Sequence, residues 1–251
     1  MLKEYALHES ITSPTSSSSY SCKSKDRAQE VLHLLSGRVV LQGKTILDLG
    51  CGPDPLSQSF QQTALRLVGL DKEKRYVKQA RKSLFLELIL GDGTALPFKD
   101  GSFTFILCND VLEHVRDDVT LMKELLRILG HNGAAYIQCA NKYQIIEPHF
   151  LLPFLSWIPR PLANIYVKIA HKGKSYDQYY PRTRRQLSSL IGKYRTADLT
   201  YERTLIKIET LNIQSKSLFR IVLFLRRVMS DRIIAVLAQN FSIISMIVFK
   251  D

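Results

Sequence analysis

The sequence lacks any apolar run long enough to cross a membrane. Its longest apolar runs, at 221–225, 233–238 and 243–249, are short and are separated by charged or polar residues, whereas a spanning helix needs about 18 consecutive apolar residues. The first 21 residues contain no apolar stretch typical of a secretory leader. We therefore expect a cytoplasmic protein whose hydrophobic residues, 45% of the chain, form a sizeable buried core.

Cysteine is scarce and shows no metal-binding pattern. Cys22, Cys51, Cys108 and Cys139 form no C-x-x-C pair and have no histidine at the spacing of a zinc ligand. We therefore expect reduced thiols and no metal site, which agrees with a cytoplasmic location.

Acidic residues are scarce in the second half of the chain. Residues 1–140 contain 17 Lys and Arg against 16 Asp and Glu, whereas residues 141–251 contain 18 against 7. Nearly all of the formal net charge of +12 therefore lies after residue 140. Such an excess predicts either a solvated basic face or contact with an anionic partner.

A regular alternation of strand and helix patterns fills the first half. Short apolar runs that end at glycine or an acid alternate with amphipathic stretches, which predicts an α/β fold with a doubly wound, mainly parallel sheet. The strands are predicted at 45–50, 65–71, 86–92, 102–110 and 133–141, and the helices at 24–36, from Asp54 onward, at 74–82 and at 119–130.

The pattern changes after Asn141. Residues 142–180 are rich in proline, aromatic and basic residues and predict a lid inserted after the fifth strand. A T-x-x-Q capping box at Thr183 and Gln186 predicts a helix over 181–194. Beyond it we expect a strand at 199–211, a helix at 217–239 and a final strand at 242–250.

The loop "GCGPDP" after the first strand lacks a third glycine. A dinucleotide fingerprint needs glycine at Pro55, and a loop that binds S-adenosylmethionine (SAM) has one at Asp54. Gly50 and Gly52 still allow a tight turn and close approach of the backbone to a ligand. Asp54 at the start of the next helix would repel a pyrophosphate but not the cationic groups of SAM. The loop therefore favours SAM over NAD.

Acidic and amide side chains follow the next strands. Asp71 ends the second strand 19 residues after Gly52, where a carboxylate can accept both ribose hydroxyls. Asp92, in "GDGTALPF", follows the third strand and could accept the adenine amino group. The segment "NDVLEH" at 109–114 follows the fourth strand and is expected to close over the amino-acid end of the ligand. These residues should meet at the carboxyl ends of the strands.

With these motifs, the chain resembles the class I SAM-dependent methyltransferases, in particular the broad group with "LDLGCGPG", "GD…ALPF…SF" and "LEHV" motifs. The resemblance covers about Ile46 to Asn141. It implies four groups of cofactor contacts: to the methionine part from Asp48, Gly50, Cys51 and Gly52, to the ribose from Asp71, to the adenine from Asp92 and Gly93, and through the backbone from Cys108 and Asn109.

The resemblance also implies a seven-stranded sheet whose last strand is antiparallel, with 199–211 and 242–250 as the sixth and seventh strands. We expect a flexible Ser-rich N-terminus at 1–23 and a single methyltransferase domain at 24–251. Within that domain, 24–141 would form the SAM-binding core and 142–251 a basic region on the acceptor side.

The expected reaction is an in-line transfer of a methyl group from SAM to an acceptor. A general base is needed where the acceptor loses a proton as it attacks. The candidates Glu147 and His149 flank Pro148 in a stiff extended tripeptide, and His171 is a weaker one. The alternative role for His149 is a structural hydrogen bond within the lid. His114 is expected to pack or to hydrogen-bond behind the cofactor.

Three functions remain open on the sequence. The first is methylation of a small or lipid-linked acceptor near a membrane. It is suggested by the apolar residues of 150–169, with Arg160 and Lys168 alongside, which fit either a lid over an apolar acceptor or an element that lies on anionic lipid. The second is RNA methylation, with Tyr176, Tyr179 and Tyr180 for stacking and five basic residues for phosphates: Lys172, Lys174, Arg182, Arg184 and Arg185. The third is a non-catalytic module that has lost the cofactor.

Overall fold

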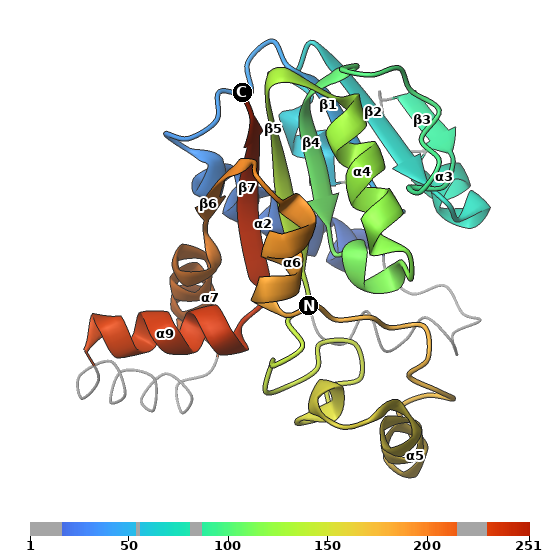
Figure 1. Cartoon of the computed structure of the whole chain (residues 1–251), viewed down its shortest axis with the longest axis vertical. Coiled ribbons are helices and arrows are strands. Elements are labelled where there is room, and N and C mark those ends of the chain that lie inside the picture. The colour runs from blue at the N-terminus through green and yellow to red at the C-terminus, as the bar shows by residue number, and fades with distance from the viewer. Residues whose placement is uncertain (1–16, 54–55, 81–86, 215–229) are drawn as a thin grey trace.

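The chain forms one seven-stranded sheet in the order β3-β2-β1-β4-β5-β7-β6, with helices on both faces (Figure 1). The computed structural model describes residues 17–53, 56–80, 87–214 and 230–251. The strands are β1 (Thr45–Leu49), β2 (Arg66–Asp71), β3 (Glu87–Leu90), β4 (Phe103–Asn109), β5 (Leu129–Cys139), β6 (Arg195–Asp198) and β7 (Ile244–Lys250).

The helices lie between these strands much as the alternating pattern predicts. They are α2 (Ser17–Leu35), α3 (Lys74–Ala80), α4 (Asp118–Ile128), α5 (Arg160–Ile169), α6 (Arg184–Ile191), α7 (Thr200–Gln214) and α9 (Asp231–Phe241), with short 3-10 helices η1 (Leu56–Phe60), η2 (Leu112–His114) and η3 (Leu155–Trp157). The first of these helices begins before the predicted residue 24, so part of the Ser-rich segment is helical.

The strand directions confirm the predicted doubly wound sheet. β1 pairs in parallel with β2 and β4, and β4 pairs in parallel with β5. β7 runs antiparallel to both β5 and β6. The central strands are buried on both faces: Leu47 packs in the cluster under α4 and α6, and Ile46 packs in the cluster under α2 and η1.

The sixth strand lies earlier than predicted. Residues 199–211 were expected to be a strand because they contain several β-branched residues, but they belong mainly to α7, and β6 ends at Asp198. Asp198 Oδ1 accepts the N–H of Thr200 and so satisfies the first turn of the helix. Leu199, Arg203 and Ile206 also recur at helical spacing and pack toward α2 and the sheet.

Two predicted helix boundaries are wrong. α4 ends at Ile128, and Gly130 lies in β5 instead of closing the helix. There a Cβ would lie 3.2 Å from the carbonyl oxygen of Gly101, a tight contact that glycine avoids. The predicted helix at 217–239 is not continuous, because Ser230 has an extended backbone and α9 starts after it. Residues 217–229 and the predicted helix start at Asp54 lie outside the described residues.

Residues 142–183, called the lid below, follow β5 and project beyond the carboxyl ends of the strands (Figure 1). The lid has its own small core, formed by Leu152, Leu155, Ala163 and Val167 with nearby tyrosines. Thr183 accepts the N–H of Gln186, and Gln186 accepts the N–H of Thr183, so the predicted capping box at the start of α6 is confirmed. Within the described residues, no helix combines the length and apolar character needed to cross a bilayer.

Candidate active site

The glycines after β1 form a tight loop at the carboxyl edge of the sheet. Gly50 and Gly52 have φ angles of 70° and 64°, a region that glycine adopts without strain. A Cβ on Gly50 would lie 2.5 Å from Cγ2 of Val111, whereas a Cβ on Gly52 would meet no atom within 4 Å. Gly50 therefore allows close packing within the protein, and Gly52 borders open space in which a ligand can approach.

The two glycines should respond differently to alanine. Gly50→Ala is expected to lower the free energy of unfolding strongly, because it adds a steric clash with Val111 to the backbone strain. Gly52→Ala should cost only the strain, about 1–2 kcal/mol, but should weaken SAM binding by filling the space beside the loop. Denaturant unfolding and calorimetric titration with SAM measure the two effects separately. Equal losses of stability in the two variants would contradict the different roles given to Gly50 and Gly52.

Asp71 connects the glycine loop to β2. Its Oδ2 accepts the N–H of Gly52 at 2.9 Å and its Oδ1 accepts the N–H of Glu73 at 2.8 Å. Each carboxylate oxygen has a second lone pair. The buried Asp71 carboxylate is therefore fixed in place and can still accept hydrogen bonds from a diol.

Asp92 and Gly93 follow β3 at the same edge. Asp92 Oδ1 accepts both the N–H and the hydroxyl of Thr94 at 2.8 Å. These bonds, first the backbone one, lower the pKa of Asp92, so its exposed carboxylate is charged at neutral pH. A Cβ on Gly93 would lie 2.6 Å from Cδ1 of Leu121, so this turn packs directly on α4.

Asp48 before the loop, Cys51 within it and Cys108 of β4 have buried side chains. The Cys51 thiol packs among Val77, Ala80 and Leu88, and the Cys108 thiol lies in the apolar cluster under α4. Burial raises the pKa of both thiols. Burial also raises the pKa of Asp48, whose Oδ2 accepts the N–H of Ser57. The two cysteines can therefore meet a ligand through their backbones alone.

A polar network on Asp110 was missed by the sequence analysis. Arg27 of α2 donates to Asp110 Oδ2 at 3.1 Å, and Gln138 of β5 donates to Oδ1 at 2.8 Å. Asn109, predicted to contact the cofactor, also donates to Oδ2 at 2.9 Å. Asp110 adopts a left-handed conformation with φ 58°. Because α2 shows only an apolar period in the sequence, nothing there indicated that Arg27 reaches the ends of β4 and β5.

The structure brings the two predicted catalytic residues together. His149 Nδ1 lies 3.0 Å from Glu147 Oε1, and Glu147 Oε2 accepts the N–H of Phe150 at 2.6 Å. A carboxylate can only accept, so Nδ1 of His149 carries the proton. His149 Nε2 lies 3.2 Å from Nε2 of His114, which links the lid to η2. His171 lies outside this cluster, exposed just past the end of α5.

Glu113 is a buried carboxyl group beside this cluster. Its Oε1 accepts the N–H of Ala140 at 3.3 Å, and its Oε2 has no hydrogen-bond partner among the described residues. Burial, and next the nearby Asp110, raise the pKa of Glu113 well above its ordinary value. A protonated Glu113 is the form that this surrounding favours.

Replacing Glu113 by glutamine should make the protein less sensitive to high pH. The folded-state pKa of Glu113 is raised, so its stabilising contribution is fully present below the unfolded pKa and is lost as the pH rises through the folded pKa. Glutamine resembles the neutral acid and does not ionise. As the pH rises from the unfolded pKa of Glu113 through its raised folded pKa, the melting temperature should therefore fall more steeply for the wild type than for Glu113→Gln. Parallel curves would contradict a neutral Glu113.

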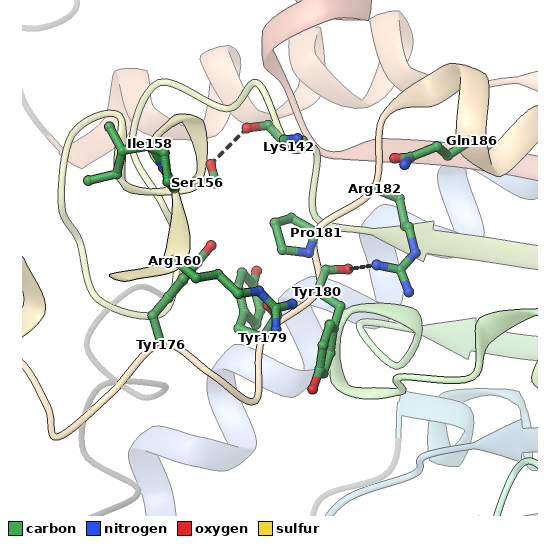
Figure 2. Close-up of a pocket in the computed structure, with 11 residues that line it drawn as sticks. Lys142, Ser156, Ile158, Arg160, Tyr176, Tyr179, Tyr180, Pro181, Arg182 and Gln186 are labelled. Atoms are coloured by element: carbon green, nitrogen blue, oxygen red, sulfur yellow. Dashed lines mark hydrogen bonds between the residues drawn. The ribbon is translucent and has the colours of Figure 1, made fainter. Parts of the chain in front are cut away.

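A cavity of about 230 Å³ lies between the lid and α6 (Figure 2). Arg160 reaches across it, and its guanidinium lies 4.3 Å from the ring centroid of Tyr180. Tyr179 lines the same cavity, and its ring centroid lies 4.2 Å from that of His149. The Tyr179 hydroxyl is buried and has no hydrogen-bond partner among the described residues. The cavity therefore adjoins the histidine cluster through Tyr179.

The sheet order, the glycine loop and the acids after β2 and β3 define the class of protein. Residues 47–137 match the family model described as a methyltransferase domain. Together with the sheet order, this match supports the prediction of a class I SAM-dependent methyltransferase. Within the described residues, no group of three or more potential ligands is placed to hold a metal ion.

Individual relatives are similar over part of the chain. An uncharacterized methyltransferase of Mycobacterium sp. strain KMS is 32% identical over 96 residues, which are 38% of each chain. A ubiquinone biosynthesis O-methyltransferase of Xanthomonas oryzae is 28% identical over 131 residues, which are 47% of this chain and 55% of that protein. The chain thus spans about half, or less, of the length of these curated relatives.

The similarity in fold extends further than the similarity in sequence. The crystal structure of an S-adenosylmethionine-dependent methyltransferase from Mesorhizobium loti matches 89% of this chain and 99% of its own, with a TM-score of 0.59 and 16% identity. At this identity the match establishes the fold alone. It extends beyond residue 137, where the family model ends.

Proposed function

We propose that the protein transfers a methyl group from SAM to a small or lipid-linked acceptor that loses a proton, with His149 as the base and Glu147 as its partner. The observation that carries this proposal is the contact of the buried Glu147 and His149 with the half-buried His114 beside the lid cavity, on a methyltransferase fold. SAM, when bound, supplies the electrophilic methyl group. The O-methyltransferase relative supports a hydroxyl as the acceptor group.

The cofactor would lie along the carboxyl ends of β1 to β4. Asp71 would accept the ribose hydroxyls, and Asp92 with Gly93 would hold the adenine. The backbone of the Gly50–Gly52 turn and of 108–109 would follow the methionine part above Asp48. The ion pair of Arg27 with Asp110, after β4, would meet the charged amino-acid end of SAM. In this division of the single domain, 24–141 binds SAM and 142–251 forms the acceptor side.

The acceptor would reach the site from the lid cavity. His149 Nε2 is the atom that can take a proton, because Nδ1 is held by Glu147. The glutamate orients the ring and stabilises the imidazolium that forms after proton transfer. Tyr179 and Arg160 offer an unused hydroxyl and a cation to polar groups of the acceptor.

The RNA alternative receives no support from two of the three tyrosines that were expected to stack on bases. Tyr176 and Tyr179 are each only 4% exposed, so their rings are not available to nucleotides. Two of the arginines expected at phosphates are paired with acids, Arg182 with Asp118 and Arg184 with Asp198. The described residues therefore favour the small-molecule or lipid acceptor.

Two measurements test the proposed function. Calorimetric titration with SAM should show binding, and absence of binding by the wild type would support the non-catalytic alternative. Incubation with methyl-labelled SAM and separate extracts of lipids, small metabolites and RNA should then place the label in the lipid or metabolite fraction. Label in RNA alone would overturn the proposed acceptor class.

A further inference from the structure

The outer side of α5 is apolar although it faces away from the protein. Its inner side buries Ala163 and Val167 in the core of the lid. On the opposite side, Leu162, Ile165 and Ile169 are 56%, 54% and 71% exposed. These three residues, the α5 stripe, recur at spacings of three and four and therefore lie on one face of the helix. The helix thus has more apolar surface than the fold buries.

The neighbouring turn of the lid also exposes apolar side chains. Phe154 and Trp157 are 49% and 41% exposed, and their ring centroids lie 5.2 Å apart. Leu155 of the same turn packs in the core that holds α5, so the turn and the helix are neighbours. Figure 1 shows α5 at the end of the molecule beyond the strands. Exposed apolar side chains that gather on one segment in this way mark an interaction surface.

The charge of the same segment identifies what it can contact. Residues 148–176 contain no Asp or Glu but include Arg160, Lys168, Lys172 and Lys174. The three lysines are exposed at or just past the C-terminal end of α5. A partner must therefore offer both an apolar phase and negative charge. A second copy of this surface carries the same positive charge and would be repelled. RNA has the negative charge but no apolar environment in which leucine and isoleucine side chains could be buried.

We propose that the lid docks on an anionic lipid bilayer. The α5 stripe and Trp157 would insert at the level of the headgroups, and Lys168, Lys172 and Lys174 would lie among the lipid phosphates. Interfacial binding requires this combination of buried apolar area and electrostatic attraction. The docking does not depend on the proposed methyl transfer, although it would bring the lid cavity to a surface that carries lipid-linked acceptors.

Vesicle flotation of the full chain tests the docking. Vesicles of phosphatidylcholine alone are compared with an equimolar mixture of phosphatidylcholine and phosphatidylglycerol. The partition coefficient should be at least about tenfold higher on the anionic vesicles and should fall as the salt concentration rises. Leu162→Gln/Ile165→Gln/Ile169→Gln should lower it at least about tenfold. Lys168→Ala/Lys172→Ala/Lys174→Ala should remove the preference for anionic lipid.

A matched control makes the same kind of substitution, an exposed apolar residue to glutamine, on a different part of the surface. Val40 and Leu65 are 73% and 76% exposed and precede β1 and β2, at the other end of the strands. Val40→Gln/Leu65→Gln should leave flotation unchanged, and all of these variants should bind SAM as the wild type does. A wild-type protein that floats with the vesicles but does not bind SAM would overturn the proposed methyl transfer and leave the docking intact.

Three results would overturn the docking. The first is equal, weak flotation of the wild type on both kinds of vesicle. The second is a concentration-dependent dimer that the triple glutamine variant abolishes without any effect on flotation, which would assign the stripe to a second copy. The third is salt-dependent RNA retention, lost in the triple alanine variant, by a protein that does not float.

Discussion

Asp71→Ala is expected to weaken SAM binding by at least about 100-fold. In the proposed site the two carboxylate oxygens accept the two ribose hydroxyls while the N–H groups of Gly52 and Glu73 hold them in place. A hydrogen bond to a charged group contributes about 1.5–3 kcal/mol, so the loss of two corresponds to roughly 100-fold or more in Kd. Calorimetric titration with SAM measures the change.

The control for this prediction must separate binding from folding, because Asp71 also connects the glycine loop to β2. Asp71→Asn keeps an oxygen that can accept one backbone N–H, so it should fold. Because it lacks the negative charge, its affinity for SAM should be reduced, as in Asp71→Ala. Asp100→Ala removes an 80% exposed aspartate that pairs with Arg127 and should leave the affinity unchanged. Wild-type affinity in a folded Asp71→Ala protein would refute the ribose assignment.

The core of the fold could be predicted because its signals are local. Each central strand is a short apolar run bounded by glycine or an acid, and burial on both faces leaves it no alternative register. The sixth strand could not be predicted in the same way. β6 has only four residues, two of them exposed, and the Leu199–Ile206 stretch is rich in residues that favour strands in other contexts. Its packing on α2, including the buried pair of Arg203 and Glu30, stabilises the helix instead.

The positions of single residues at the sheet edge were predictable, whereas contacts between residues far apart in the chain were missed. Asp71 and Asp92 follow strands directly, so their place at the sheet edge follows from the topology. Contacts of His114 with His149, by contrast, join residues 35 positions apart through an irregular lid. No periodicity encodes that contact. The same holds for Arg27 and Asp110, which are 83 positions apart.

His149→Ala is expected to lower kcat by about 100- to 10,000-fold, the usual contribution of a general base, while the affinity for SAM stays the same. The reason is geometric: Glu147 fixes Nδ1 of His149, so Nε2 is the one ring nitrogen that can take a proton from the acceptor. Rates are measured with the acceptor that the labelling experiment identifies. Glu147→Gln should lower kcat in the same direction, because it removes the charge that stabilises the imidazolium.

A structural role for His149 predicts a different outcome. If the ring served only to hold the lid, His149→Ala would reduce the melting temperature, and the folded fraction would keep its normal kcat. His131→Ala, at an exposed histidine of β5, is the control and should change neither quantity. His114→Ala then decides the route of the proton. Activity retained in that variant means that the acceptor reaches Nε2 of His149 directly by taking the place of the His114 ring, whereas a loss comparable to His149→Ala means that the proton leaves through His114.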